Sequence, residues 1–348
     1  MRVFCDHHHQ ALFNSLQILF EDRLGWELYR PIGTEWFDQG YWMVYNHPAT
    51  VNQFLGIHQG EKLLDTHGDP YPEEAQVNKH AELRDDIYFI KDISHEKHHK
   101  AVTLDIFKDM EFDIVISSIP AHISRFNRLI AEHQPKAKHI FQVGNAWGHQ
   151  ADVKNILAST APFPVPAGIN TCFYHQEFDL NVFKYQPPTI TGVVNSYVHY
   201  MRKPEIMTAV AGFLPPWKFT TYGAGMMDSL PGIHPMAAAM TNSSFTWHYK
   251  PEGDGYGHTL HNSYACGRPA IIWGDQYKGK LADALFQDGV TCIDARGKTP
   301  HQIATSLVTY GPPAKHARMC EAAYNRFKEV VDFDEEAATI KKFLENLQ

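Results

Sequence analysis

A stretch in the last third of the chain combines glycines, an aromatic residue and a carboxylate in a way that suits anion binding. Gly255 and Gly257 flank Tyr256 directly before a segment with helical spacing, and glycines let the backbone approach a ligand closely. The amino end of a helix carries free N–H groups and a positive dipole potential, which favour a diphosphate. Asp254 adds a carboxylate beside this turn. The sequence therefore predicts a ligand-binding turn at a helix start, with a plain glycine turn as the alternative.

Alternating strand and helix patterns surround this stretch and would position it. Short apolar runs that indicate buried strands occur at 1–5, 26–29, 87–90, 112–118, 139–143, 153–159, 190–195, 218–222, 244–249, 269–273 and 291–294. Helical spacing occurs at 10–24, 124–133, 260–266 and 300–348, with an interruption at 311–313. Such alternation predicts parallel sheets with functional loops at the carboxyl ends of their strands. Residues 46–100 do not fit this pattern as a whole, and the charged run 95–100 is predicted to be a solvated loop.

Length, charge and cysteine usage limit the class of protein. A chain of 348 residues is long for one hydrophobic core and favours two domains, with a boundary after 186, where two prolines follow Gln186. The formal net charge of −8 disfavours a protein that coats nucleic acid with its whole surface. The five cysteines lack CxxC spacing, which indicates reduced thiols. With no signal peptide and no membrane-spanning run, we expect a cytoplasmic protein, in the host cytoplasm if it is viral.

The order of several motifs resembles retaining glycosyltransferase family four. Residues 254–271 align with the donor-binding segment of that family, E-G-F-G-x-x-x-x-E-A-x-A-x-G-x-P-V-I. Asp254 falls on its first acidic position and Asn262 on its second. Further matches are the helix-to-strand turn at 265–269, the strand-ending G-x-G at 223–225, the interdomain segment at 167–170, the hairpin at 288–294, and the first helix and strand at 10–29.

This resemblance implies the GT-B architecture, an α/β fold of two Rossmann-like parallel-sheet domains that face a cleft. The expected acceptor-side domain is 1–186, the donor domain is 187–331, and 332–348 forms a C-terminal helix that returns to the first domain. The implied activity is transfer of a hexosyl or pentosyl group from a UDP- or GDP-linked sugar to an acceptor hydroxyl, with retention. No cofactor and no metal are expected, because cations and helix dipoles can stabilise the departing diphosphate.

The resemblance and the positions of the strand ends assign candidate site residues. The donor-binding candidates are Gly223, Gly225, Gly255, Tyr256, Gly257, His258, Thr259 and Asn262. The catalytic candidates are Asp254, His122, Arg202 and Lys203, and the acceptor-side candidates are His7, His8, His9 and Asn145. Two features depart from the family pattern. The ribose-binding acid is an amide, Asn262, and the basic pair for the diphosphate stands later than in the family, with Lys278 and Lys280 as the other candidates.

Several assignments keep alternatives open. The side chains of three consecutive histidines diverge, so a metal site at 7–9 is disfavoured against a cleft lining or a solvated loop. The basic pair at 202–203 could equally be surface charge. The alternative functions are a nucleotide-sugar epimerase or phosphorylase on the same fold and a non-catalytic sugar-nucleotide binding protein. The acceptor could be a glycan, a lipid-linked sugar, a small metabolite or a hydroxylated base in modified viral DNA, which is the one way in which nucleic acid would take part.

Overall fold

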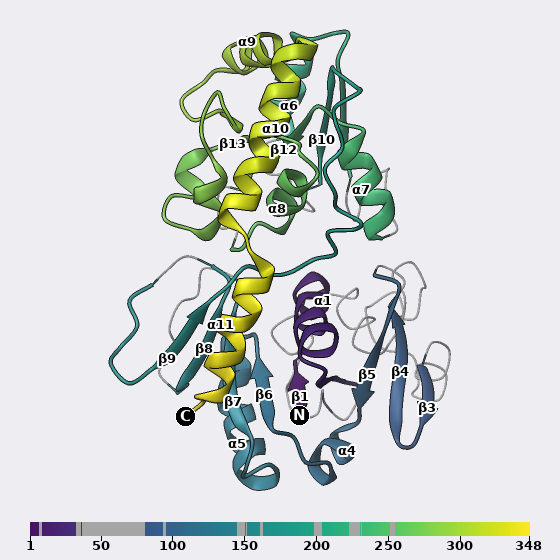
Figure 1. The fold of residues 1–348 in the computed structure, drawn as a ribbon, viewed down its shortest axis with the longest axis vertical. Helices are drawn as coiled ribbons and strands as arrows, with labels where there is room; N and C mark the ends of the chain where they lie inside the picture. Colours follow the sequence, from purple (N-terminus) through teal and green to yellow (C-terminus); the bar gives the residue numbers. More distant parts are fainter. Residues whose placement is uncertain are drawn as a thin grey trace. The chain divides into compact units, whose positions relative to one another are not determined.

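A computed structural model describes most of the chain. The described residues are 1–6, 9–32, 36, 81–92, 95–144, 150, 152–160, 163–197, 204–222, 230, 232–250 and 255–348. The chain divides into two compact units (Figure 1). Unit 1 comprises Met1–Ala158, Phe163–Glu177 and Ala337–Gln348, and unit 2 comprises Ser159–Pro162 and Phe178–Glu336. None of the helices in the described part of the chain is long and apolar enough to cross a membrane.

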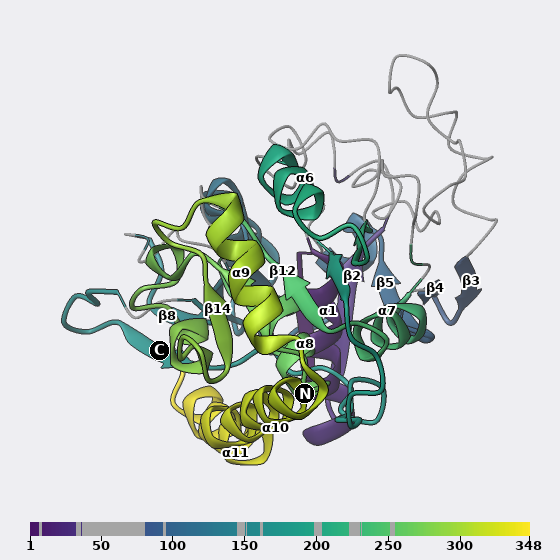
Figure 2. The same cartoon turned by 90° about the horizontal axis from the view of Figure 1, so that it is seen from above.

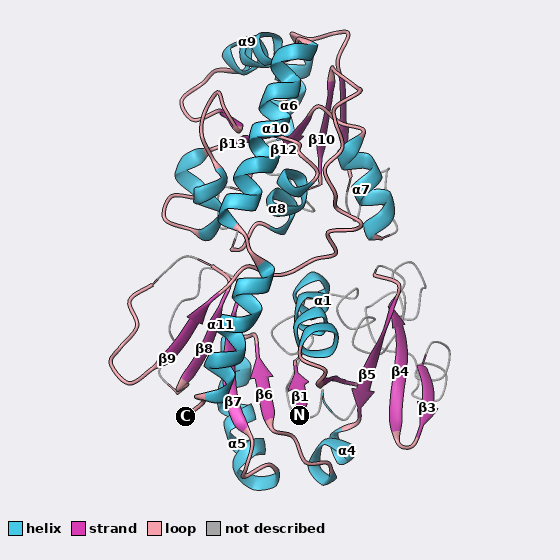
Figure 3. Ribbon diagram, in the orientation of Figure 1, coloured by secondary structure: helices cyan, strands magenta, loops and turns pink. Residues whose placement is uncertain are grey.

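Unit 1 is built on a mixed sheet (Figure 3). Its strands are β1 Arg2–Cys5, β2 Glu27–Pro31, β3 Ala81–Arg84, β4 Ile87–Asp92, β5 Lys97–Val102, β6 Ile114–Ser117, β7 Lys138–Val143, β8 Asn155–Ala158 and β9 Asn170–Phe173, in the order β3-β4-β5-β2-β1-β6-β7-β8-β9. The pairs β3–β4 and β4–β5 are antiparallel, and the other pairs are parallel. The chain direction across the sheet reverses between β1 and β6, which is the switch point where doubly wound sheets bind ligands.

The prediction of a solvated loop at 95–100 is wrong, because β5 begins at Lys97. This strand pairs with β2 on one side, where Tyr29 lies opposite Lys100, and with β4 on the other, where Ile90 lies opposite His99. The polar composition of these residues favours a loop, but pairing with strands on both edges overrides that local preference. His99 is consequently 1% exposed.

Helices cover both faces of the unit 1 sheet. They are α1 Gln10–Gln17 with the π-helical turn η1 Ile18–Arg23, α4 Leu104–Asp109, the 3-10 turn η3 Pro120–His122, α5 Ile123–His133, and the end of α11 Phe333–Glu345. The spacing of Leu12, Leu16 and Leu19 places them together in a core that also contains Ile114. Ile340, Phe343 and Leu344 of α11 pack into the same core. The chain end is also hydrogen-bonded, since Asn155 Nδ2 donates to the Gln348 carbonyl at 3.1 Å.

Acid should destabilise unit 1 through its buried histidines. Burial lowers the pKa of His139 to about 4, against an attractive contribution from Asp6, so the folded state holds this imidazole neutral. The unfolded chain takes up a proton below pH 6.5, so the stability that neutral His139 supplies is present above that pH and is lost as the pH falls from 6.5 to about 4. The free energy of unfolding of unit 1 falls by up to roughly 3 kcal/mol over this range. Thermal unfolding at pH 7 and pH 4.5 measures it, and His139→Gln should show a smaller fall; an equal fall would contradict the assignment.

Unit 2 is a parallel sheet with helices on both faces. Its strands are β10 Val193–Ser196, β11 Lys218–Thr221, β12 Phe245–Trp247, β13 Ala270–Ile272 and β14 Cys292–Asp294, in the order β11-β10-β12-β13-β14. Its helical segments are α6 Pro204–Gly212, α7 Ile233–Thr241, α8 His258–Ala265, η4 Gly274–Gln276, η5 Leu281–Leu285, α9 Pro300–Tyr310 and α10 Pro313–Val330. The direction reverses between β10 and β12, which is the switch point of this sheet.

Successive side chains of β13 point to opposite faces of the sheet and enter two different cores of unit 2. Ile271 packs with residues of α6 and α9, whereas Ala270 and Ile272 pack with residues of α8 and α10. Figure 2 shows the helices α6, α8, α9 and α10 around the strands of unit 2. The helix α8 therefore lies on a sheet face with its start near the carboxyl end of β12.

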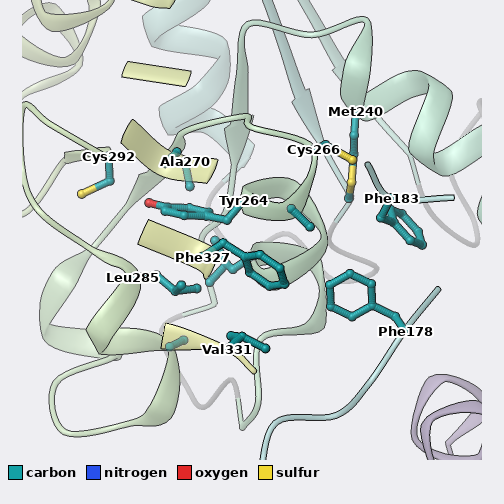
Figure 4. Packing of buried hydrophobic residues seen from close by; sticks show 14 of the residues in the cluster. Phe178, Phe183, Met240, Tyr264, Cys266, Ala270, Leu285, Cys292, Phe327 and Val331 are labelled. Carbon is teal, nitrogen blue, oxygen red and sulfur yellow. The ribbon is translucent and has the colours of Figure 1, made fainter. Parts of the chain in front are cut away.

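The segment that follows unit 1 packs into unit 2 earlier than the boundary predicted at 186. Phe178 and Phe183 belong to the core that contains Phe327 (Figure 4). The ring centroids of Phe178 and Phe327 are 5.9 Å apart, and Tyr185 stacks on Tyr324 at 4.6 Å. The two prolines after Gln186 mark a rigid extended stretch within unit 2, and the division falls at Glu177 and Phe178.

Candidate functional site

Eight of the candidate site residues lie outside the described residues. They are Arg202, Lys203, Gly223, Gly225, Asp254, His7, His8 and Asn145. The described candidates are His9, His122, Asn262 and residues 255–259. Among the described residues, no group of three or more His, Cys, Asp or Glu side chains is arranged to hold a metal ion.

The predicted turn before α8 has the conformation that its glycines allow. Gly257 is the N-cap of α8, with φ 78° and ψ 47°, a left-handed conformation that a residue with a side chain rarely adopts. As a glycine, Gly257 has no side chain with which to cap this helix end. The N–H groups of the first turn, which belong to His258 and Thr259, point out of the helix end. Both of these residues are partly exposed, so this turn can present N–H groups and a positive dipole end to an anion.

Tyr256 supports this turn from inside the protein. Its ring is stacked on the His261 ring, with centroids 4.1 Å apart and an 8° angle between the planes, and the residue is 4% exposed. The His258 ring meets it edge-on at 5.0 Å. His261 Nδ1 lies 3.1 Å from the Gly257 carbonyl oxygen, so the imidazole donates to the N-cap residue. The aromatic position of the motif therefore fixes the glycine turn from the buried side.

Asn262 lies one turn further along α8. It is four residues after His258 and three after Thr259, so it shares their helix face, and its side chain leans toward the amino end. The residue is 6% exposed, and its Oδ1 has no hydrogen-bond partner among the described residues. A buried acceptor without a partner costs about 1–3 kcal/mol. A ligand hydroxyl at this position would supply the missing donor.

The remaining side chains of α8 anchor the helix. Ser263 Oγ lies 2.6 Å from Thr246 Oγ1 and donates to the Arg268 carbonyl at 2.9 Å. The Tyr264 hydroxyl donates to the Thr291 carbonyl at 2.8 Å. These bonds tie α8 to β12, to the turn before β13 and to the residue before β14. The carboxyl-terminal turn of α8 is therefore fixed against the unit 2 sheet.

In unit 1, the structure brings His122 together with Asp6, a residue that the sequence analysis did not name. Asp6 follows β1 directly, and its Oδ2 lies 3.1 Å from His122 Nδ1. The Ser118 N–H donates to both carboxylate oxygens at 2.8 Å, and the Ser118 hydroxyl donates to Oδ1. Asp6 and His122 are each 1% exposed. A carboxylate directly after the first strand of a parallel sheet was the available signal, since both residues lie at the switch point.

His9, the described member of the histidine run, has a local structural contact. It is the N-cap of α1, and its Nδ1 accepts a hydrogen bond from the Leu12 N–H at 3.4 Å. A residue that caps a helix in this way satisfies one of the N–H groups that have no partner within the helix. The acceptor-side role assigned to His9 stays a prediction.

No protein-family model matches the sequence, and no curated protein matches it. Solved structures of low sequence identity do match over the full length. Anabaena HepE, solved in complex with UDP-glucose, is 11% identical, with 100% of each chain covered and a TM-score of 0.59. A glycosyltransferase from Rickettsia africae is 10% identical, with 99% of each chain covered and a TM-score of 0.59. Sucrose-phosphate synthase from Thermosynechococcus elongatus is 11% identical, with 99% of this chain and 98% of that chain covered and a TM-score of 0.59.

These likenesses confirm the fold class predicted from the order of the motifs. The chain has the GT-B fold, with one Rossmann-like parallel core in each unit and a last helix whose end packs in unit 1. At 10–11% identity, they establish the fold and carry no residue-level role. The assignment to retaining family four stays a resemblance of motifs.

Proposed function

We propose that this chain is a glycosyltransferase that moves a sugar from a nucleoside-diphosphate sugar to an acceptor hydroxyl. The proposal depends on the start of α8. There Gly257 opens the helix and has no side chain to cap it, and the buried Asn262 Oδ1, one turn along the helix, has no hydrogen-bond partner among the described residues. The complex of HepE with UDP-glucose, a protein of the same fold, supports a nucleotide sugar as the donor.

The proposed donor site lies in unit 2. The N–H groups of His258 and Thr259 hold the diphosphate, and Asn262 Oδ1 accepts a hydrogen bond from a ribose hydroxyl. Residues assigned from the sequence complete the proposed donor site. They are Asp254, Gly223, Gly225, Arg202 and Lys203. Unit 1 is proposed to hold the acceptor. Neither a metal nor a cofactor belongs to the proposal, because helix N–H groups and cations can stabilise the leaving diphosphate.

Ligand-induced stabilisation tests the donor class. UDP, GDP, dTDP and their sugar conjugates are added to the full chain, and a ligand at 100 times its dissociation constant raises the free energy of unfolding by about 2.7 kcal/mol. A product assay then separates the alternatives. Sugar transfer requires an acceptor, epimerisation changes the donor without one, and a binding protein releases the nucleotide sugar unchanged. No stabilisation by any of these nucleotides would reject the proposal.

Substitution of Asn262 should separate affinity from stability. Asn262→Leu removes an unsatisfied buried oxygen, so we expect unchanged or higher stability together with a roughly tenfold loss of UDP affinity, close to the worth of one hydrogen bond. Asn262→Glu, which restores the acid of the family pattern, should preserve or tighten the affinity. Titration calorimetry with UDP measures both. The control is Ser263→Ala, which loses internal bonds and stability on the same helix but should bind UDP as the wild type does. Wild-type affinity in Asn262→Leu would contradict the ribose contact.

The stereochemical outcome depends on which group takes the acceptor proton. Retention, which the resemblance implies, would use an oxygen of the donor's own phosphate, so no protein base is needed. Inversion needs a base on the acceptor side, because the acceptor then attacks from the face opposite the leaving phosphate.

A further inference from the structure

An imidazole of α8 donates a hydrogen bond to the carbonyl group that opens the same helix. His261 Nδ1 lies 3.1 Å from the Gly257 carbonyl oxygen, and a carbonyl oxygen can only accept, so Nδ1 carries the hydrogen. The same oxygen also accepts from the Leu260 N–H at 2.9 Å and from the His261 N–H at 3.2 Å. Three donors therefore converge on one carbonyl group, and the third comes from a side chain.

The ring that supplies the third donor is fixed by its packing. It stacks on the Tyr256 ring, with centroids 4.1 Å apart and an angle of 8° between the planes, and His261 is 0% exposed. The peptide group between Gly257 and His258 is planar, so its N–H points away from its carbonyl oxygen. Anchoring the Gly257 oxygen inside the helix therefore directs the His258 N–H out of the helix end.

We propose that His261 is a positioning residue for the diphosphate site at the start of α8. This inference rests on the proposed donor site, in which the N–H groups of His258 and Thr259 hold the diphosphate. A hydrogen bond that a peptide carbonyl accepts polarises the whole peptide group and strengthens the bond that its N–H donates. His261 thus acts on the ligand through the Gly257 carbonyl, because it both orients and polarises the peptide group that follows.

A second buried group indicates a ligand at this helix start. Asn262 follows His261 directly and shares a helix face with His258 and Thr259. Its Oδ1 is buried and has no hydrogen-bond partner among the described residues. The family-four motif leaves position 261 unspecified, so the role of His261 is inferred from the contacts of this chain and not from the resemblance.

Two variants separate the hydrogen bond of His261 from the packing of its ring. His261→Phe keeps an aromatic ring against Tyr256 but has no N–H donor. Its affinity for a nucleoside diphosphate should therefore fall about three- to tenfold, close to the worth of one hydrogen bond. His261→Asn loses the ring but carries an amide nitrogen near the position of the imidazole Nδ1. This variant should recover most of the affinity, although loss of the stacked ring lowers its stability.

Titration calorimetry of the full chain with UDP, GDP and dTDP measures these affinities. The matching nucleosides lack the diphosphate, so His261→Phe should bind them as the wild type does, whereas its affinity for inorganic pyrophosphate should fall with that for the nucleotides. The matched control is His316→Phe. It also removes a buried imidazole that donates to a backbone carbonyl of unit 2, that of Ser244 at 2.8 Å, and it should lose stability but keep the wild-type affinities.

NMR of the wild type with nitrogen-15-labelled histidine gives a second measurement. Hydrogen bonds on the two sides of one peptide group strengthen each other. Saturation with the tightest-binding of the three nucleotides should therefore move the proton resonance of His261 Nδ1–H downfield. The signal is assigned from its absence in His261→Asn.

Two results would overturn the positioning role and leave the donor site in place. One is wild-type nucleotide affinity in folded His261→Phe, and the other is an equal loss in His261→Phe and His261→Asn, which would assign the effect to the ring alone. If His261→Phe does not fold, an Nδ1–H resonance that nucleotide does not move would overturn the role. If none of the three nucleotides binds the wild type, the donor site is overturned, and this inference with it.

Discussion

A chain that ends at Glu336 should lose the cooperative folding of unit 1 and keep that of unit 2. The deletion removes Ile340, Phe343 and Leu344, which are 3%, 7% and 5% exposed in the unit 1 core. Loss of a large buried apolar side chain costs about 2–5 kcal/mol. Three such losses are comparable to the 5–15 kcal/mol that stabilises a typical domain. The core residues of unit 2, by contrast, all precede the cut.

Hydrogen exchange resolved along the chain measures this effect. Amide protection in β1 and β6 should disappear in the truncated protein, whereas protection in β12 and β13 should remain. Ile340→Ala in the full chain should have a smaller effect and lower the free energy of unfolding of unit 1 by about 2–5 kcal/mol. The control is Lys341→Ala, an exposed position on the same helix, which should stay within about 0.5 kcal/mol of the wild type. Unchanged protection of β1 after truncation would show that α11 does not support unit 1.

Arg268→Met should destabilise unit 2 by roughly 3–5 kcal/mol, because it leaves several buried carbonyl acceptors without donors. The guanidinium is 1% exposed and donates to the Thr241 carbonyl at 2.6 Å and the Gln186 carbonyl at 2.9 Å. It also donates to the carbonyls of residues 266 and 267. Thr241 ends α7, and residues 266 and 267 follow the end of α8, so the cation sits where two helix dipoles are negative. Methionine fills much of the volume but leaves these buried acceptors without donors, at about 1–3 kcal/mol each.

Urea unfolding monitored by tryptophan fluorescence measures the loss in unit 2. Arg268→Lys should recover part of the stability, because an ammonium can reach only some of the carbonyls that the planar guanidinium spans. Arg318→Met is the control, since Arg318 is exposed on α10 and should cost less than about 0.5 kcal/mol. Equal stability of the two methionine variants would mean that solvent replaces the buried cation.

The local sequence pattern was enough to predict those elements whose own residues specify their conformation. The apolar runs at 112–118 and 139–143 became β6 and β7, because strands buried on both faces need no partner information to be recognised. The start of α8 was predicted for a similarly local reason, since glycine adopts the left-handed conformation of position 257 far more readily than residues with a side chain. The order of these local signals was sufficient to predict the fold class.

The tertiary structure decided what depends on residues far apart in the sequence. The polar strand β5 exists because β2 and β4 pair with it, so its own composition predicted a loop. The sequence named His122 but not Asp6, because their contact arises only when β1 and β6 lie side by side in the sheet. The structure divides the two units after Glu177, because Phe178 and Phe183 pack in a core with residues of α10, more than a hundred residues later in the chain. The spacing of residues along the chain shows which side chains share a face of a helix or strand. The tertiary structure decides which of these faces pack together, and so which side chains are buried and which hydrogen-bond partners they have.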